Sequence, residues 1–312
     1  MPGGVINTGS HPKLLWPGVH ETWGQVYAEH QTEYTDLYDV LESDQAYEED
    51  VQITPFGLAP LKPEGQPGTY DSEVQGPVSR YQNLAYFLGY IVTFEELQDN
   101  QYPIVATRRA KSNAFSIAQT VENVGAFLYN NAFVTTFFTM GDGLALGSSA
   151  HTNTTGGTFS NILSPAADLS ETALEDASIQ IMGYQDDRGN PINLMPTSLI
   201  VSRQNWYEAN RIMKSVLQSN TTSNNINVLK ATNAFPNGIK MNHYLLSAAP
   251  WFLRTNCPNG MQLFWRQRPD LLRTTILTPK TPRPRPICGF RSARPIRGAG
   301  LESTLRRQEG RQ

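Results

Sequence analysis

The sequence predicts an α+β fold in which helices and strands are intermingled along the chain. Three features predict it: a helical period over residues 103–131, a Pro- and Gly-rich stretch between two strand-like runs, and short helices and strands up to residue 265. With 312 residues, 39% of them hydrophobic, the chain can bury a sizeable core. No run approaches the roughly 18 apolar residues of a membrane span, and the start lacks a secretory signal. We therefore expect a protein made in a cytoplasm.

The N-terminal region, residues 1–50, predicts an irregular arm followed by an aromatic helix. Glycines and prolines interrupt residues 1–20, which argues against regular structure there. Large side chains then recur every three or four residues, as on one face of a helix: Trp23, Tyr27, His30, Tyr34, Tyr38 and Leu41. Such a stripe is more typical of a core or an interface than of an aromatic ligand site.

Residues 51–92 predict an extended hairpin. Strand-like runs at 51–54 and 84–92 flank residues 55–78, where prolines and glycines are too dense for a regular helix. Loops of this length in a compact domain are usually functional or disordered. In a protein that assembles, such an arm would reach over a neighbouring subunit.

The clearest element is a helix over residues 103–131. Pro103 suits the first helical turn, and small or apolar residues keep close to a 3.6-residue period: Ala110, Ala114, Ile117, Val121, Gly125 and Leu128. Roughly 28 residues at 1.5 Å each give a helix about 42 Å long. Because this helix is longer than most in globular proteins, we expect it to serve as a spine.

The part of the chain after the spine predicts a mixture of short elements. A polar loop at 141–157 leads to a capping-box pattern, Asp168 with Glu171, at the start of a helix that stops at Gly183. A turn follows at 186–191. Beyond it the pattern predicts a strand at 198–201, a helix at 205–217, and strands at 226–229, 244–246, 251–253 and 261–265.

Three places invite a catalytic or binding interpretation, and each has a simpler one. The glycines at 141–147 have neither GxGxxG nor P-loop spacing, which favours a flexible loop. His151 follows Ser148, but without a GxSxG elbow or a positioned acid we expect a surface histidine in a polar loop. Asp186 and Asp187 suit a divalent ion, yet the Arg-Gly-Asn-Pro that follows them is more typical of a turn.

The sequence therefore predicts no catalytic, cofactor-binding or metal-binding residue. No two histidines have the spacing of metal ligands in a motif such as HExxH. The histidines are His11, His20, His30, His151 and His243. Cys257 and Cys288 are far apart, so we expect small buried hydrophobes or surface thiols, and neither a disulfide nor a zinc site. The lack of a catalytic constellation is weak support for a structural role.

Several stretches, taken in order, resemble a known family. They read YFLGYIVTFEELQDNQYPIVATRRAKSNAFSIAQTVENVGAFLYNNAF, SSAHTNTTGGTFSNILSPAADLSETALEDA and YQDDRGNPINLMPTSLIVSRQNWYEANRIMKS. The first is similar to the strand and spine helix of tailed-bacteriophage major capsid proteins, and the others to the loop, turn and strand that follow. The closest group is the Mu-like major head subunit family. The resemblance covers about residues 10–268 and is specific as an ordered series.

The resemblance implies a Hong Kong 97-type capsid fold and a protein that self-assembles into the icosahedral shell enclosing phage DNA. It implies no enzymatic activity and no cofactor. On this basis the chain has an arm with the aromatic helix (1–50), an extended loop (51–92), a peripheral domain with the spine helix (93–139), an axial domain (140–268) and an atypical basic tail (269–312).

The resemblance also implies partners and a location. The partners are copies of the chain itself in hexamers and pentamers, a separate scaffold or maturation protease, the portal, decoration proteins and, non-specifically, the packaged DNA. The location is the virion, after assembly in the cytoplasm of a bacterial host, with no membrane involved.

The C-terminus departs from the family. From Arg273 the chain reads RTTILTPKTPRPRPICGFRSARPIRG, where the family has an acidic, Asn-rich turn and a strand of the kind YxRFSxGxxDPRG. Codons can be chosen for this string so that a second reading frame, which starts at the third base of the Arg273 codon, encodes NNDFDTENAKAKAYMRFSVGATDPR. That peptide is the tail that the family has. We therefore hypothesise that residues from about 271 to 312 follow a frameshift.

Three other interpretations remain open from the sequence. A cellular nanocompartment shell of the same fold would enclose a protein cargo in place of viral DNA. A nucleic-acid-binding protein would use the Arg-rich tail, with salt-sensitive DNA affinity that disappears when residues 271–312 are removed. A cytoplasmic hydrolase built on His151 and Ser148 has the least support, since it requires a turnover that substitution of His151 abolishes.

Overall fold

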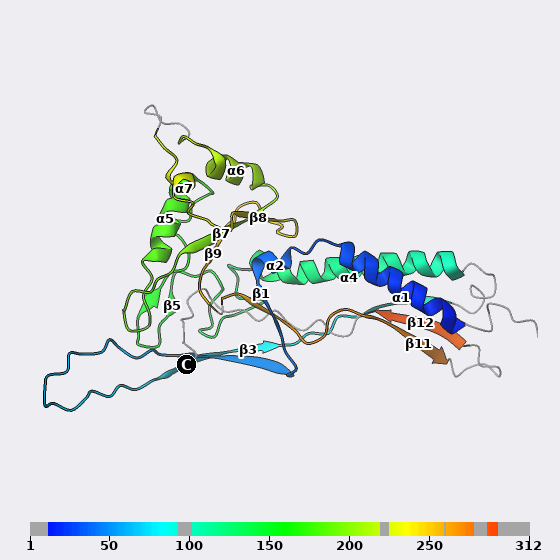
Figure 1. Cartoon of the computed structure of the whole chain (residues 1–312), viewed down its shortest axis with the longest axis horizontal. Coiled ribbons are helices and arrows are strands. Elements are labelled where there is room, and N and C mark those ends of the chain that lie inside the picture. The colour runs from blue at the N-terminus through cyan, green and yellow to red at the C-terminus, as the bar shows by residue number, and fades with distance from the viewer. Residues whose placement is uncertain (1–11, 93–101, 219–224, 259, 278–285, 293–312) are drawn as a thin grey trace, which may run out of the picture.

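The computed structural model describes residues 12–92, 102–218, 225–258, 260–277 and 286–292. Figure 1 shows a long body that contains α1 and α4, a compact part above one end of it, and a hairpin that projects below. Helix α4, Tyr102–Asn130, is the longest element and confirms the spine expected over 103–131. No helix within the described segments is long and apolar enough to cross a membrane.

Small residues on α4 allow a second helix, α1 (Pro12–Glu29), to pack closely beside it. Helix α1 corrects the expectation of an irregular arm through residue 20. Its proline start costs little, because the first amides of a helix have no intrahelical partner, and burial of one apolar face then stabilises the rest. The buried residues of this interface are Val19, Trp23, Ala106, Ala110 and Ala114.

The aromatic stripe is distributed over several elements, which corrects the expectation of one aromatic helix. Trp23 and Tyr27 stack on α1 with ring centroids 5.3 Å apart. The chain then leaves the helix, forms the short helix α2 (Tyr34–Leu37) and enters the strand β1 (Asp39–Glu42). The later aromatic residues enter the central core instead of continuing the α1 face. Periodicity identified the buried side chains but not the break between the elements.

The central core joins the spine to strands from the two ends of the sequence. Strand β1 pairs in parallel with β10 (Gln262–Trp265). A second sheet, in the order β11–β12–β4, contacts α4 through β4 and β12. Its strands are β4 (Leu88–Val92), β11 (Leu271–Leu277) and β12 (Pro286–Ser292). Side chains of the central core include Tyr38, Val121, Tyr129, Ile200, Leu263 and Trp265.

The projecting hairpin consists of β2 (Tyr47–Ile53) and β3 (Gln75–Gln82), which pair antiparallel, with residues 54–74 between them. This confirms an extended hairpin, but its second strand is not the run expected at 84–92. The end of that run is β4, which pairs with β12. Strand β3 also corrects the expectation of a loop through residue 78, because Gly76 and Pro77 are untypical of a strand. Only long-range pairing decides that residues 75–82, and not 84–92, join β2.

The compact part is a three-stranded sheet, in the order β8–β7–β9, with three helices packed around it. The strands are β7 (Pro196–Ser202), β8 (Ile239–Asn242) and β9 (Phe252–Thr255), and the helices are α5 (Glu171–Met182), α6 (Trp206–Lys214) and α7 (Val228–Ala231). Its core contains Leu174, Leu199, Val201, Ala209 and Phe235.

Expectations for the compact part are confirmed for its longer elements and wrong for some short ones. The strand at 198–201 and the helix at 205–217 correspond to β7 and α6, and the strands at 251–253 and 261–265 to β9 and β10. Residues 226–229 enter α7, and residues 244–246 contain no strand. Helix α5 ends at Gly183 as expected, but its N-cap is Ser170, whose side chain accepts the amide of Ala173, and not Asp168.

Candidate functional site: an extended hairpin

The tip of the hairpin exposes large apolar side chains away from every core. Leu61 and Tyr70 have 94% and 96% of their surface exposed. We define the apolar tip as Phe56, Leu58, Leu61 and Tyr70, all more than half exposed. Figure 1 shows the segment between β2 and β3 extending past the rest of the molecule. A group of exposed apolar side chains of this kind marks a candidate contact surface for another chain.

The ribbon behind the apolar tip has a buried face and an exposed face. Tyr81 is buried in the central core, whereas Val51 and its cross-strand partner Val78 are exposed. On the exposed face, Arg80 forms an ion pair of 2.5 Å with Glu49. The Arg80 guanidinium also lies 4.5 Å from the centre of the Tyr47 ring. These cross-strand contacts stabilise the ribbon that carries the tip.

The root of the hairpin contacts the turn at 186–191. Asp186 Oδ1 accepts the amides of Arg188 at 2.9 Å and Asn190 at 2.8 Å, and Gly189 has a φ of +83°. The predicted turn is therefore confirmed, with Gly189 at the position that favours glycine. In the part of the chain that the structure describes, no group of three His, Cys, Asp or Glu side chains is placed to hold a metal ion.

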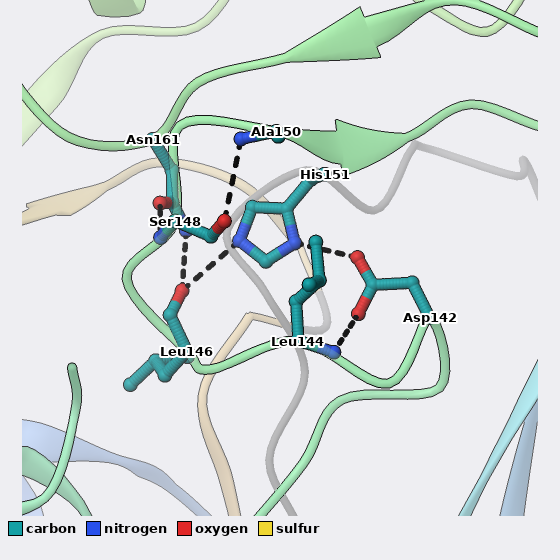
Figure 2. A network of polar contacts seen from close by, with 7 residues as sticks. All are labelled: Asp142, Leu144, Leu146, Ser148, Ala150, His151 and Asn161. Carbon is teal, nitrogen blue, oxygen red and sulfur yellow. Dashed lines mark hydrogen bonds and ion pairs between the residues drawn. The ribbon is translucent and has the colours of Figure 1, made fainter. Parts of the chain in front are cut away.

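His151 is buried, with 2% of its surface exposed, which corrects the expectation of a surface histidine. Figure 2 shows its two ring nitrogens facing different partners. Nδ1 lies 2.6 Å from Asp142 Oδ2, and Nε2 lies 3.2 Å from the carbonyl oxygen of Leu146. Ser148 Oγ instead accepts the amide of Ala150. Because both imidazole nitrogens are occupied, the arrangement holds a loop together and does not form a serine–histidine pair.

Asp142 is a partner that sequence reasoning missed. It lies nine residues before His151, a spacing that belongs to no motif, and its glycine neighbours suggested only a flexible loop. Asp142 also accepts the amide of Leu144 at 3.0 Å through its other carboxylate oxygen. The only available signal was the general rule that a buried polar side chain finds a partner, and the sequence did not show that His151 is buried.

Glu122 on α4 is a second polar residue that sequence reasoning missed. Only 1% of its surface is exposed, although charged side chains of a helix mostly face solvent. Its carboxylate accepts the backbone amides of Glu33 at 3.0 Å and Tyr34 at 2.9 Å. Burial raises the pKa of Glu122 to about 7, since desolvation outweighs the two hydrogen bonds, which lower it. Glu122 therefore links the spine to α2.

The cysteines and the other histidines form no common centre among the described residues. Cys257 is buried, and the side chain of Cys288 lies outside the described residues, as does His11. His20 pairs with Asp270 at 3.0 Å. The remaining two are His30, near Tyr244, and His243, which pairs with Glu33.

Comparison with known proteins connects this geometry to a family. The family model described as "phage capsid protein" matches residues 86–280, more than half of the chain. No curated protein matches the chain. Among solved structures, the capsid of bacteriophage JBD30 matches with a TM-score of 0.53 at 11% identity, over 70% of this chain and 92% of that chain.

Two further solved structures resemble the chain more weakly. The capsid of Myoviridae phage XM1 has a TM-score of 0.49 at 11% identity, over 88% of this chain and 90% of that chain. A virus-like particle from Pyrococcus furiosus has a TM-score of 0.46 at 12% identity, over 90% of this chain and 93% of that chain.

The likeness to the JBD30 capsid shows the fold, which is the Hong Kong 97 type expected from the resemblance. The family match favours a capsid protein over a nanocompartment shell, a DNA-binding protein or a hydrolase. It includes the whole of α4 and the compact part. On this match, the chain belongs to the phage capsid protein family.

Proposed function

We propose that this major capsid protein forms its shell from hexamers and pentamers, with the extended hairpin of each subunit lying across the adjacent one. The shell is the capsid of the virion, so the role is structural and the chain catalyses no reaction. The observation that carries the proposal is the apolar tip, whose four large side chains are more than half exposed in the subunit. A neighbouring copy of the same chain supplies the surface that covers them.

The energy of such a contact is modest for each subunit and large for the shell. Full burial of one large apolar side chain contributes about 1.5–3 kcal/mol, from which the ordering of the tip subtracts. Every copy repeats the same contact, because one interface in a symmetric assembly recurs at every related position. Many weak contacts of this kind close a shell, whereas one pair of subunits stays weakly bound.

The compact part offers a second apolar surface for assembly. Around α6 and α7, several large apolar side chains are exposed, namely Tyr207, Val216, Ile226, Val228 and Leu246. We assign residues 140–268, which include the compact part, to the axial domain around the centre of each hexamer or pentamer. The peripheral domain is then residues 93–139, with the N-terminal arm at 1–50, the hairpin loop at 51–92 and the basic tail at 269–312.

Other partners follow from the same role. The shell would assemble with a separate scaffold or maturation protease, enclose DNA non-specifically, and carry a portal and decoration proteins. The net charge of −3 is compatible with this role, because DNA confined by a closed shell does not require a strongly basic subunit.

The test is negative-stain electron microscopy with size-exclusion chromatography on the full chain, alone and with a co-expressed scaffold. We expect rings or closed shells from the parent chain or from a version that carries the restored tail. A variant with Leu58→Ser, Leu61→Ser and Tyr70→Ser should remain monomeric, with an unchanged circular dichroism spectrum.

The matched control is Lys62→Ser with Glu64→Ser, which changes exposed polar residues of the same segment. This control should assemble like the parent. Shells from the apolar variant at the parent's yield would remove the proposed role of the tip. Monodisperse monomers from every version, even with the scaffold, would contradict self-assembly itself.

A further inference from the structure

One turn of the compact part holds both strands of the projecting hairpin. Asp187 Oδ2 accepts a hydrogen bond of 3.0 Å from Gln52 Nε2 on the outgoing strand β2. The next residue, Arg188, reaches the returning chain, where its Nη1 lies 2.8 Å from Asp71 Oδ2 and its Nη2 donates to the carbonyl of Ser72 at 2.8 Å. Two consecutive side chains therefore contact the hairpin from both sides of its root.

The two ends of this contact are themselves fixed. Asp71 Oδ2 also accepts the amide of Gly57 at 2.8 Å, so that the ion pair closes the hairpin loop onto itself as well as onto the turn. Asp187 is held in place by Thr154 Oγ1 at 3.2 Å. On β3, Gly76 passes so close to Thr154 that a Cβ there would lie 2.8 Å from the Thr154 hydroxyl.

Beside these polar contacts lies an open pocket of about 880 Å³, which Thr54, Val74 and Tyr184 line together with Arg188. Two buried polar atoms of its lining residues, Thr54 Oγ1 and Arg188 Nε, have no hydrogen-bond partner in the described structure. A close-packed apolar root would fix the hairpin rigidly, whereas polar contacts beside an open pocket leave room for it to change angle.

We infer that the turn at residues 186–189 is a clasp that sets the direction of the hairpin, with Asp187 and Arg188 as its positioning residues. The inference rests on the proposed function, in which the hairpin must meet the adjacent subunit. A partly exposed ion pair contributes little to global stability, so opening the clasp should redirect the hairpin without unfolding the subunit. The clasp orients the apolar tip before docking and thereby favours one geometry of neighbour contact.

The test measures the hairpin directly in the full chain, below the concentration at which it assembles. Spin labels at Leu61→Cys on the tip and Ile179→Cys on α5, with Cys257→Ala and Cys288→Ser, report the distance between the tip and the compact part by pulsed electron paramagnetic resonance. We expect one narrow distance distribution in this parent. Arg188→Asp should shift and broaden it, and adding Asp71→Arg to Arg188→Asp should restore the narrow peak.

The matched control is Arg211→Asp, which makes the same charge change in an exposed ion pair with Glu208 on α6 and should leave the distribution unchanged. Asp71→Ala opens the clasp from the exposed hairpin side, in case Arg188→Asp does not fold. Without the spin-label changes, Arg188→Asp should lower the yield of closed shells, and the charge swap should recover it.

An unchanged distribution in the folded clasp variants, or a swapped pair that stays broad, would overturn the clasp. Its failure is distinguishable from failure of the proposed function. The serine variant of the apolar tip tests docking without touching the clasp, and the spin-label distance tests the clasp without requiring a shell.

Discussion

The backbone amide of Tyr34 donates a hydrogen bond of 2.9 Å to the carboxylate of Glu122, in the interior of the spine helix. The amide of Glu33 donates to the other carboxylate oxygen. The first amides of a short helix need an acceptor, and α2 takes one from a different helix, without a side-chain hydrogen bond from its own N-cap residue. A buried carboxylate thus attaches the start of α2 to the spine.

Burial of the Glu122 carboxylate makes stability depend on pH. Its pKa is raised from 4.5 to about 7 by burial, so between these values the folded chain holds a proton that the unfolded chain releases. Its contribution to stability is therefore fully present below about pH 4.5 and is lost as the pH rises to about 7. At about 1.4 kcal/mol per pKa unit, the change is on the order of 3 kcal/mol.

Glu122→Gln should remove this part of the pH dependence, whatever its effect on stability at a single pH. Urea unfolding of parent and variant at several pH values between the two pKa values gives the free energy of unfolding of each as a function of pH. A variant whose free energy of unfolding changes with pH as the parent's does would show that another group titrates there.

Alanine at Gly125 should destabilise the protein, although alanine is the better helix former. A Cβ at Gly125 would lie 2.9 Å from the Tyr34 Cβ, in the tight contact between α4 and α2. We expect a loss of about 1–3 kcal/mol from overpacking. Gly24→Ala on α1 is the matched control, because nothing lies within 4 Å of its added Cβ, and it should stabilise by about 0.5–1 kcal/mol. Thermal unfolding of both variants shows whether each substitution raises or lowers stability. A stabilising Gly125→Ala would contradict the tight contact between α4 and α2.

Removal of the Asp142 carboxylate should cost stability, since it leaves a buried imidazole nitrogen without its partner. We expect Asp142→Ala to lower the free energy of unfolding by about 1–3 kcal/mol. Ser148→Ala is the comparison, because Ser148 is partly exposed and makes no contact with the His151 ring, and its effect should stay within about 0.5 kcal/mol. Denaturant titration of both variants distinguishes them. An equal loss from Ser148→Ala would contradict the assigned network.

The C-terminal tail gives a prediction about the gene. We expect the reading frame that starts at the third base of the Arg273 codon to encode NNDFDTENAKAKAYMRFSVGATDPR. Leu271 is still buried in the interface between α1 and α4, whereas residues 278–285 and 293–312 lie outside the described residues. Sequencing the gene tests the frame, and its failure to encode that peptide ends the hypothesis. Shells formed only by the version with the restored tail would support it.

The elements whose structure depends on residues close to one another in the sequence were predicted from the sequence. The apolar period from Ala110 to Leu128 specified the spine, and the Asp-Asp-Arg-Gly-Asn-Pro run specified the turn that ends at Pro191. Both depend on contacts one or two helical turns away or within a single loop. Strand β7 was also predicted, because its apolar run suits a strand buried on both faces.

Tertiary structure alone decided which of these pieces touch. The run at 84–92 was expected to pair in the hairpin, but it contributes β4 to a sheet with β12, whereas residues 75–82, partly expected as loop, pair with β2. His151 stands in a polar run and is nevertheless buried against Asp142. The turn at 186–191 was visible in the sequence, whereas its hold on the hairpin was not. Strand pairing, the burial of polar groups and contacts between distant segments depend on partners far along the chain, and local periodicity carries no information about those partners.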